Sequence, residues 1–169
     1  YDEHTALLDS TTLEVKGILD GCLDNSPQFS WSPNSKSVLV FSGVNSAIWD
    51  VETLAVIFHL DTNGKYIYTA DWSFDGKTIA VGTSGSLGLY DSICGKLCGS
   101  FDVDCQSGPL CVKWSNKSLL AAGYFCSNDH VVWDTANDVH HTMDVHAASS
   151  TCINVVEWTY WDNNPMLMT

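Results

Sequence analysis

An internal repeat of about 42 residues constrains this 169-residue chain more than any other feature. A tryptophan recurs 41, 42 and 44 residues apart, at Trp31, Trp72, Trp114 and Trp158. An aspartate that closes an apolar run recurs 41, 41 and 43 residues apart, at Asp9, Asp50, Asp91 and Asp134. Because two independent markers keep one period, the chain is a tandem array of similar structural units.

Within one unit, the residues predict short antiparallel strands. Tyr66 to Asp91 reads YIYTADWSFDGKTIAVGTSGSLGLYD, in which turn residues such as Asp75-Gly76 separate three apolar runs. The runs are too short for ordinary helices, and GTSGSLG fits a hairpin turn between the second and third strands. Four short strands in roughly 40–45 residues, with an aspartate closing the third, are typical of a WD-repeat β-propeller blade. We therefore predict an all-β fold, a partial WD-repeat β-propeller of about three blades plus flanking strands.

The repeat also divides the chain. Residues 1–24 are either the approach to the first blade or the last strands of a preceding blade, as the spacing of Asp9 suggests. Blades are expected at residues 25–62, 63–104 and 105–148, and residues 149–169 begin a further blade. Because a closed ring normally needs four to eight blades, we expect a fragment.

The marker residues have structural explanations. A single small sheet cannot bury both of its faces, so the four tryptophans are expected to fill the space between neighbouring blades. The aspartates are expected to hold tight turns rather than to act in catalysis. His146 lies 12 residues before Trp158 and is expected to hydrogen-bond within its blade. His140 and His141 fall on an outer strand or loop, where we expect them to face solvent.

Composition excludes several classes of function. The chain has 20 acidic residues against seven lysines and no arginine, for a formal net charge of −13, so nucleic acid is not an expected partner. It has no apolar run near 18 residues and no leader pattern at its start, so we expect neither a membrane partner nor secretion. The seven cysteines show no disulfide framework, which favours reduced thiols in the cytosol or nucleus. Cys94 and Cys98 lack a second pair at ligand spacing, so no metal is expected.

No catalytic constellation is found in the sequence. GTSGSLG lacks the lysine of a phosphate-binding loop and the G-x-S-x-G spacing of a nucleophile elbow. We therefore predict a protein that is not an enzyme, with no catalytic residue, no cofactor and no small-molecule substrate. An enzyme with a site in the propeller channel is a rival reading, but it would require polar groups that converge there.

Two segments show a closer resemblance. VKGILDGCLDNSPQFSWSPNSKSVLVFSGVNSAIWDVETL and GKYIYTADWSFDGKTIAVGTSGSLGLYD resemble the fizzy family, the activator subunits of the anaphase-promoting complex. VKWSNKSLLAAG, whose first turn is expected to be about two residues shorter than those of the other units, is similar to the abbreviated third blade of that family. The resemblance runs from about Leu13 to the end. Coronin-like propellers are the nearest competitor, although their blade usually has a longer, more basic loop where YFCSND stands.

The resemblance implies a non-enzymatic substrate adaptor of a ubiquitin ligase, acting in mitotic or meiotic cell-cycle control. Its partners would be the anaphase-promoting complex and degron-bearing substrates. In that family, an acidic residue just before the first-blade tryptophan helps to take the arginine of a destruction-box peptide, and here that position is Ser30. The ligase-docking motifs of the family do not occur in this sequence, so no site residue is carried over. The alternative is a generic WD-repeat interaction scaffold, such as a coronin-like cytoskeletal protein.

Overall fold

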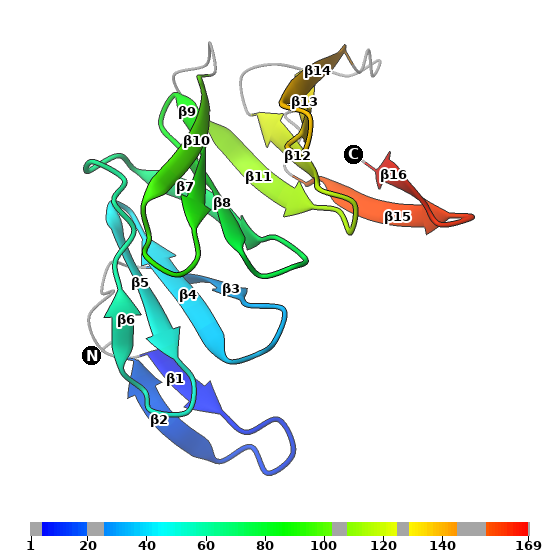
Figure 1. Ribbon diagram of the computed structural model, residues 1–169. Coiled ribbons are helices and arrows are strands. Elements are labelled where there is room, and N and C mark those ends of the chain that lie inside the picture. Colours follow the sequence, from blue (N-terminus) through cyan, green and yellow to red (C-terminus); the bar gives the residue numbers. More distant parts are fainter. Residues whose placement is uncertain (1–4, 20–25, 103–107, 125–128, 145–154, 169) are drawn as a thin grey trace.

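The computed structural model describes residues 5–19, 26–102, 108–124, 129–144 and 155–168. Within these ranges the chain forms sixteen strands and no helix, so the all-β prediction is confirmed. None of the described residues forms a helix that is long and apolar enough to cross a membrane. The strands follow one another as separate antiparallel sheets, each formed by neighbours in the sequence (Figure 1).

Three of the sheets are four-stranded blades. The first blade contains β3 (Gln28–Trp31), β4 (Ser37–Ser42), β5 (Asn45–Asp50) and β6 (Val56–Phe58). The second contains β7 (Ile67–Trp72), β8 (Thr78–Thr83), β9 (Ser86–Asp91) and β10 (Leu97–Asp102). The third contains β11 (Pro109–Trp114), β12 (Leu119–Tyr124), β13 (Asp129–Asp134) and β14 (Val139–Asp144). In each blade the strand order in space equals the order in the chain.

Two-stranded sheets flank the blades. β1 (Thr5–Leu8) pairs with β2 (Val15–Leu19), and β15 (Glu157–Trp161) pairs with β16 (Asn164–Met168). In the first pair, Oδ1 of Asp9 accepts hydrogen bonds from the amides of Thr11 and Thr12. Aspartates in the three blades hold the turn between the third and fourth strands in the same way, so β1 and β2 have the local geometry of those outer strands.

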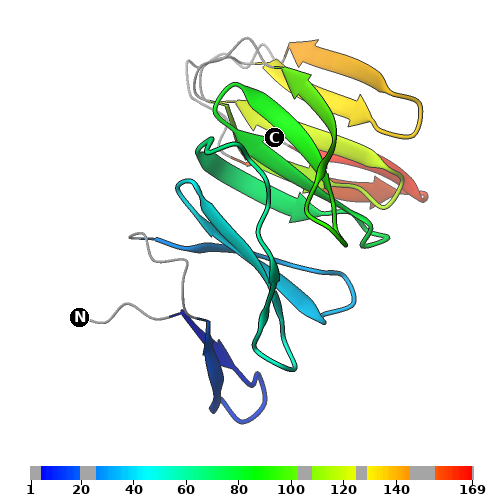
Figure 2. The same ribbon diagram turned by 60° about the vertical axis from the view of Figure 1, so that its left-hand side comes forward.

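The blades stack side by side through their inner strands. β7 lies between β3 and β11, and β15 lies beyond β11 (Figures 1 and 2). Both faces of a blade are therefore covered, as β8 shows. Ile79 and Val81 join the core between the first and second blades, whereas Ala80, which points to the other face, joins the core between the second and third. This is the arrangement of a WD40 β-propeller, present here as a partial one.

The hairpin turns agree with the sequence pattern. GTSGSLG forms the end of β8, the turn and the start of β9, with Gly85 at φ 77°. A positive φ of this size suits glycine because it has no Cβ to clash with the neighbouring carbonyl. Gly43, at φ 57°, is the first residue of the corresponding two-residue turn between β4 and β5, whereas Gly85 is the second residue of its turn.

Two predictions about local structure are wrong. Trp31 is not a core residue, since 47% of its surface is exposed. Among the described residues, β3 has an inner-strand neighbour, β7, on one side alone. Trp72 is buried as predicted. The first turn of the third blade is shorter than those of the other two by one residue, not two, because four residues separate β11 from β12 and five separate β7 from β8.

Candidate functional site

The turns at one end of the blades are fixed by side-chain hydrogen bonds. The serine after each blade tryptophan accepts a hydrogen bond from the first amide of the next strand: Ser32 from Ser37, Ser73 from Thr78 and Ser115 from Leu119, over 2.9–3.1 Å. In the first two blades the serine hydroxyl also donates to a side chain two residues on, Asn34 or Asp75, at 2.8 Å. These turns are preorganised by the chain itself.

The closing aspartates hold the other turn at this end, as predicted. Oδ1 of Asp50, Asp91 and Asp134 accepts hydrogen bonds from the amides two and three residues on. Hydrogen bonds from the side chain and the amide of the residue three positions on favour the charged carboxylate most, so the pKa values of all three lie below the ordinary value of 3.8. This role in the turn is enough to explain why the aspartate recurs in each unit.

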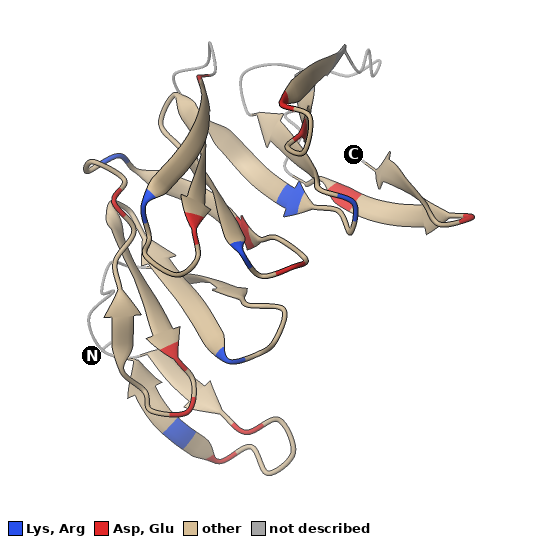
Figure 3. Cartoon of the chain, in the orientation of Figure 1, with Lys and Arg blue, Asp and Glu red and all other residues tan. Residues whose placement is uncertain are grey.

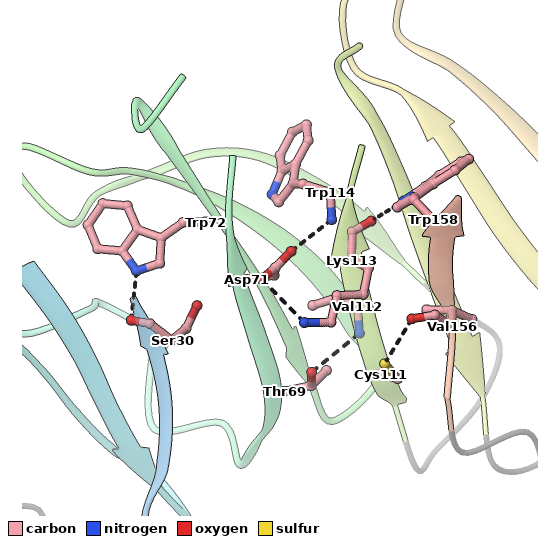
Figure 4. A network of polar contacts seen from close by, with 10 residues as sticks. All are labelled: Ser30, Thr69, Asp71, Trp72, Cys111, Val112, Lys113, Trp114, Val156 and Trp158. Carbon is pink, nitrogen blue, oxygen red and sulfur yellow. Dashed lines mark hydrogen bonds and ion pairs between the residues drawn. The ribbon is translucent and has the colours of Figure 1, made fainter. Parts of the chain in front are cut away.

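A polar network joins the inner strands of neighbouring blades (Figure 4). Nε1 of Trp72 donates to the carbonyl of Ser30 at 3.0 Å, and Nε1 of Trp158 donates to the carbonyl of Lys113 at 2.8 Å. In both cases the indole of one unit donates to a backbone carbonyl of the preceding unit. That carbonyl belongs to the residue just before the tryptophan of that preceding unit. These bonds fix the register between blades.

Trp114 departs from this pattern. Its Nε1 is buried and has no hydrogen-bond partner among the described residues, while its backbone amide donates to Oδ2 of Asp71 at 2.8 Å. Nζ of Lys113 lies 3.7 Å from the other carboxylate oxygen. Burial raises the pKa of Asp71 above its ordinary value, although the Trp114 amide and the Lys113 charge act in the opposite direction.

A pocket of about 270 Å³ lies between the second and third blades, next to this network. It is lined by Ser73, Phe74, Asp75, Thr78, Trp114, Ser115, Asn116, Ser118, Thr135 and Ala136. These residues come from the β7–β8 turn, the β11–β12 turn and the β13–β14 turn. The pocket is therefore made entirely of preorganised turns and one inner-strand tryptophan.

The shorter turn of the third blade helps to explain this opening. Between the first and second blades, the ring of Pro33 packs close to Gly76, so that Cγ would lie 3.3 Å from a Cβ added there. Phe74 occupies the place of Pro33 one unit later, but the turn it faces has one residue fewer, and 72% of the Phe74 surface is exposed. On its other side the short turn is fastened by Tyr160, whose hydroxyl accepts from the Asn116 amide at 3.0 Å.

Asp75 is the one charged side chain among the described residues that line the pocket. The Lys77 amide, followed by the Ser73 hydroxyl, lowers its pKa, so the side chain is a carboxylate at neutral pH. Nζ of Lys77 lies 3.6 Å away, but this lysine is largely exposed and such ion pairs are weak. Acidic side chains also mark many of the turns elsewhere in the chain (Figure 3).

A second pocket, of about 240 Å³, is apolar. Thr5, Ala6, Leu7, Leu8, Leu19, Phe29, Trp31 and Val38 line it, between the first two-stranded sheet and the first blade. The exposed faces of Leu8, Phe29 and Trp31 meet here. The sequence analysis did not predict this patch, because it treated Trp31 as core.

The structure places the residues singled out from the sequence in different environments. Ser30, at the position that is acidic in the fizzy family, is only 7% exposed, so its side chain is not open to solvent. His146 lies outside the described residues. His59, 13 residues before Trp72, was not singled out from the sequence, but its Nδ1 lies 2.6 Å from the carbonyl of Ser46 in the same blade, the kind of contact expected of His146.

His140 and His141 both lie on the outer strand β14, as predicted. His141 is exposed, but the solvent-facing prediction is wrong for His140. Its ring packs against Phe101 and Trp133, with ring centroids 4.4 and 4.9 Å apart. Cys94 and Cys98 are free thiols, and no group of three or more His, Cys, Asp or Glu side chains placed to hold a metal occurs among the described residues.

The chain is similar to a known family of WD40 domains. Residues 29–117 match the family model described as the anaphase-promoting complex subunit 4 WD40 domain. The match covers more than half of the chain, from β3 to the β11–β12 turn, and so includes Phe74, Asp75 and Trp114. A search of curated proteins finds no match.

Proposed function

The chain belongs to the family of the anaphase-promoting complex subunit 4 WD40 domain, and from that premise we propose that it is a protein-interaction scaffold within this ubiquitin ligase. The family match is the observation that carries the proposal. The architecture supports it, because stacked blades fixed by turn and inter-blade hydrogen bonds present a rigid surface at little entropic cost to binding. The scaffold acts without catalysis, in the cytosol or nucleus, and its partners are other proteins.

The narrower role that the fizzy resemblance implies, an activator that takes degron peptides, remains a prediction. It has less support than a scaffold role, because the family match is to a different subunit and Ser30 is buried beneath Trp72. The two roles make different demands on the molecule. An activator binds a destruction-box peptide by itself, whereas a scaffold needs only to bind other subunits.

Co-purification tests the proposal. The full chain, tagged and expressed in cells, should retain identified subunits of the anaphase-promoting complex at a fixed ratio through a high-salt wash. Gly82→Ala, which disturbs the packing of the second blade on the third, is the matched negative control. If the folded chain retains none of these subunits, the scaffold proposal is wrong. Direct binding of a destruction-box peptide, with only substoichiometric retention of the ligase, would instead favour the activator role.

A further inference from the structure

We propose that the pocket between the second and third blades binds a basic side chain, best an arginine, from an extended segment of a protein partner. This inference rests on the proposed function, because it assigns one contact of the scaffold to a defined site. The site is the 270 Å³ pocket with Phe74, Asp75 and Trp114 in its wall.

Charge selects the class of ligand. Asp75 is the only charged group in the described wall, and its carboxylate is more than half exposed. The whole chain carries a formal charge of −13, which attracts a basic segment from a distance. Lys77 competes for the carboxylate, but its side chain is 81% exposed, so an incoming cation can displace it easily.

The aromatic wall distinguishes arginine from lysine. Phe74 stands next to Asp75 in the turn and is largely exposed. A planar guanidinium can stack on this ring while it donates hydrogen bonds to the carboxylate, whereas an ammonium is a compact, strongly hydrated charge. An exposed aromatic ring beside a carboxylate, both in a fixed turn, therefore suits an arginine best.

The preceding junction in the same chain supplies an internal control. There Pro33 replaces Phe74, and Asn34 replaces Asp75 with the same turn geometry. Oδ1 of Asn34 accepts from the Lys36 amide at 3.0 Å, as Oδ1 of Asp75 accepts from the Lys77 amide at 3.0 Å. Asp75→Asn thus removes the charge while it keeps the turn, and Asn34→Asp adds a carboxylate next to Pro33 instead of next to a phenylalanine.

The experiment titrates the full chain with three capped peptides, Gly-Ser-Arg-Ser-Gly and the same peptide with lysine or with neutral citrulline in place of arginine. The reporter is the indole ¹H–¹⁵N resonance of Trp114, assigned by its loss in Trp114→Phe. The arginine peptide should shift this resonance saturably and the lysine peptide should bind about threefold more weakly. Citrulline, or the Asp75→Asn variant, should weaken binding about tenfold. Phe74→Ala should weaken binding by the arginine peptide about fivefold.

Equal binding of the arginine and citrulline peptides, or unchanged binding by Asp75→Asn, would overturn the inference. An equal gain of arginine binding by Asn34→Asp at the first junction would also overturn it, since the pocket would then add nothing to a surface charge. Failure of the chain to retain ligase subunits would contradict the proposed function but leave the titration result standing. Retention of those subunits without arginine binding would contradict the proposed arginine site but leave the proposed function standing.

Discussion

The indole of Trp72 donates a hydrogen bond to the carbonyl of Ser30, across the boundary between two blades, at 3.0 Å. Trp114 stands one unit later in the same place, yet its Nε1 has no hydrogen-bond partner among the described residues. The two residues thus share a position in the repeat but differ in one hydrogen bond, which makes them a natural pair for measuring what that bond contributes.

Replacing each tryptophan with phenylalanine separates the hydrogen bond from ring packing. Trp72→Phe should lower the free energy of unfolding by about 1–3 kcal/mol in addition to the cost of the lost ring volume. The reason is that the buried Ser30 carbonyl loses the indole donor. Trp114→Phe loses ring volume, but it also removes a buried donor that has no hydrogen-bond partner among the described residues. Urea unfolding of both variants gives the comparison, and a loss from Trp114→Phe equal to or larger than that from Trp72→Phe would contradict the assigned role of the bond.

Local chemistry made much of the fold predictable from sequence. Asp50 and Asp91 hold their turns with amides only two and three residues away, so sequence spacing alone indicates their role. The buried β8 likewise reads as a continuous apolar run, because its two faces join two different cores. Such features depend on few distant residues.

The features that sequence missed depend on what lies beside a residue. Trp31 has the same motif as Trp72, but it is half exposed because, among the described residues, no inner strand of a preceding blade packs against β3. The pocket arises from a difference of one residue between two turns, which comparison of the repeats overestimated. The pairing of Asp71 with Lys113 had a signal, since the two residues occupy the same place before successive tryptophans and carry opposite charges.

The apolar patch of Leu8, Phe29 and Trp31 should make the chain self-associate. At roughly 25 cal/mol per Å², covering even a few hundred Å² of apolar surface is worth several kcal/mol. Phe29→Thr combined with Trp31→Thr should reduce association, measured by sedimentation velocity at several concentrations. A wild-type chain that stays monomeric at all of them, with a sharp reversible melting transition, would show that the patch is not adhesive.

Asp50 should make the chain less stable in acid. Hydrogen bonds from the Thr53 amide, then the Thr53 hydroxyl, lower its folded pKa below 3.8. A lowered pKa stabilises the fold above pH 3.8, and this contribution is lost as the pH falls through the folded pKa. Asp50→Asn keeps an acceptor oxygen for the turn, so its difference from wild type should shrink towards pH 2. Thermal melts from pH 2 to 7 measure this, and a difference that stays constant with pH would exclude the linkage.

Asp71 should show the opposite dependence. Because burial raises its folded pKa, its contribution to stability is most favourable below pH 3.8 and declines as the pH rises through the folded pKa. Asp71→Asn can still accept from the Trp114 amide and has no buried charge, so relative to wild type it should gain stability as the pH rises. Melting both proteins over the same pH range tests the sign. If the stability of the variant instead falls relative to wild type as the pH rises, the Lys113 ion pair outweighs the cost of burying Asp71.

Gly82 should not tolerate a side chain at the contact between the second and third blades. A Cβ at this position would lie 2.5 Å from Cγ of Pro109 and 2.8 Å from Cγ2 of Thr69, closer than real atoms pack. Gly82→Ala must therefore push β8 away from the inner strand of the third blade, and such overpacking typically costs about 1–3 kcal/mol.

Gly99→Ala is the matched control, because its nearest neighbour, Trp133, would lie at an ordinary 3.6 Å. The control should be neutral or stabilising by up to about 1 kcal/mol, since alanine restricts the unfolded chain. Equal stability of the two variants in urea would show that the second and third blades can separate at this point without cost, and that their packing is looser than the structure indicates.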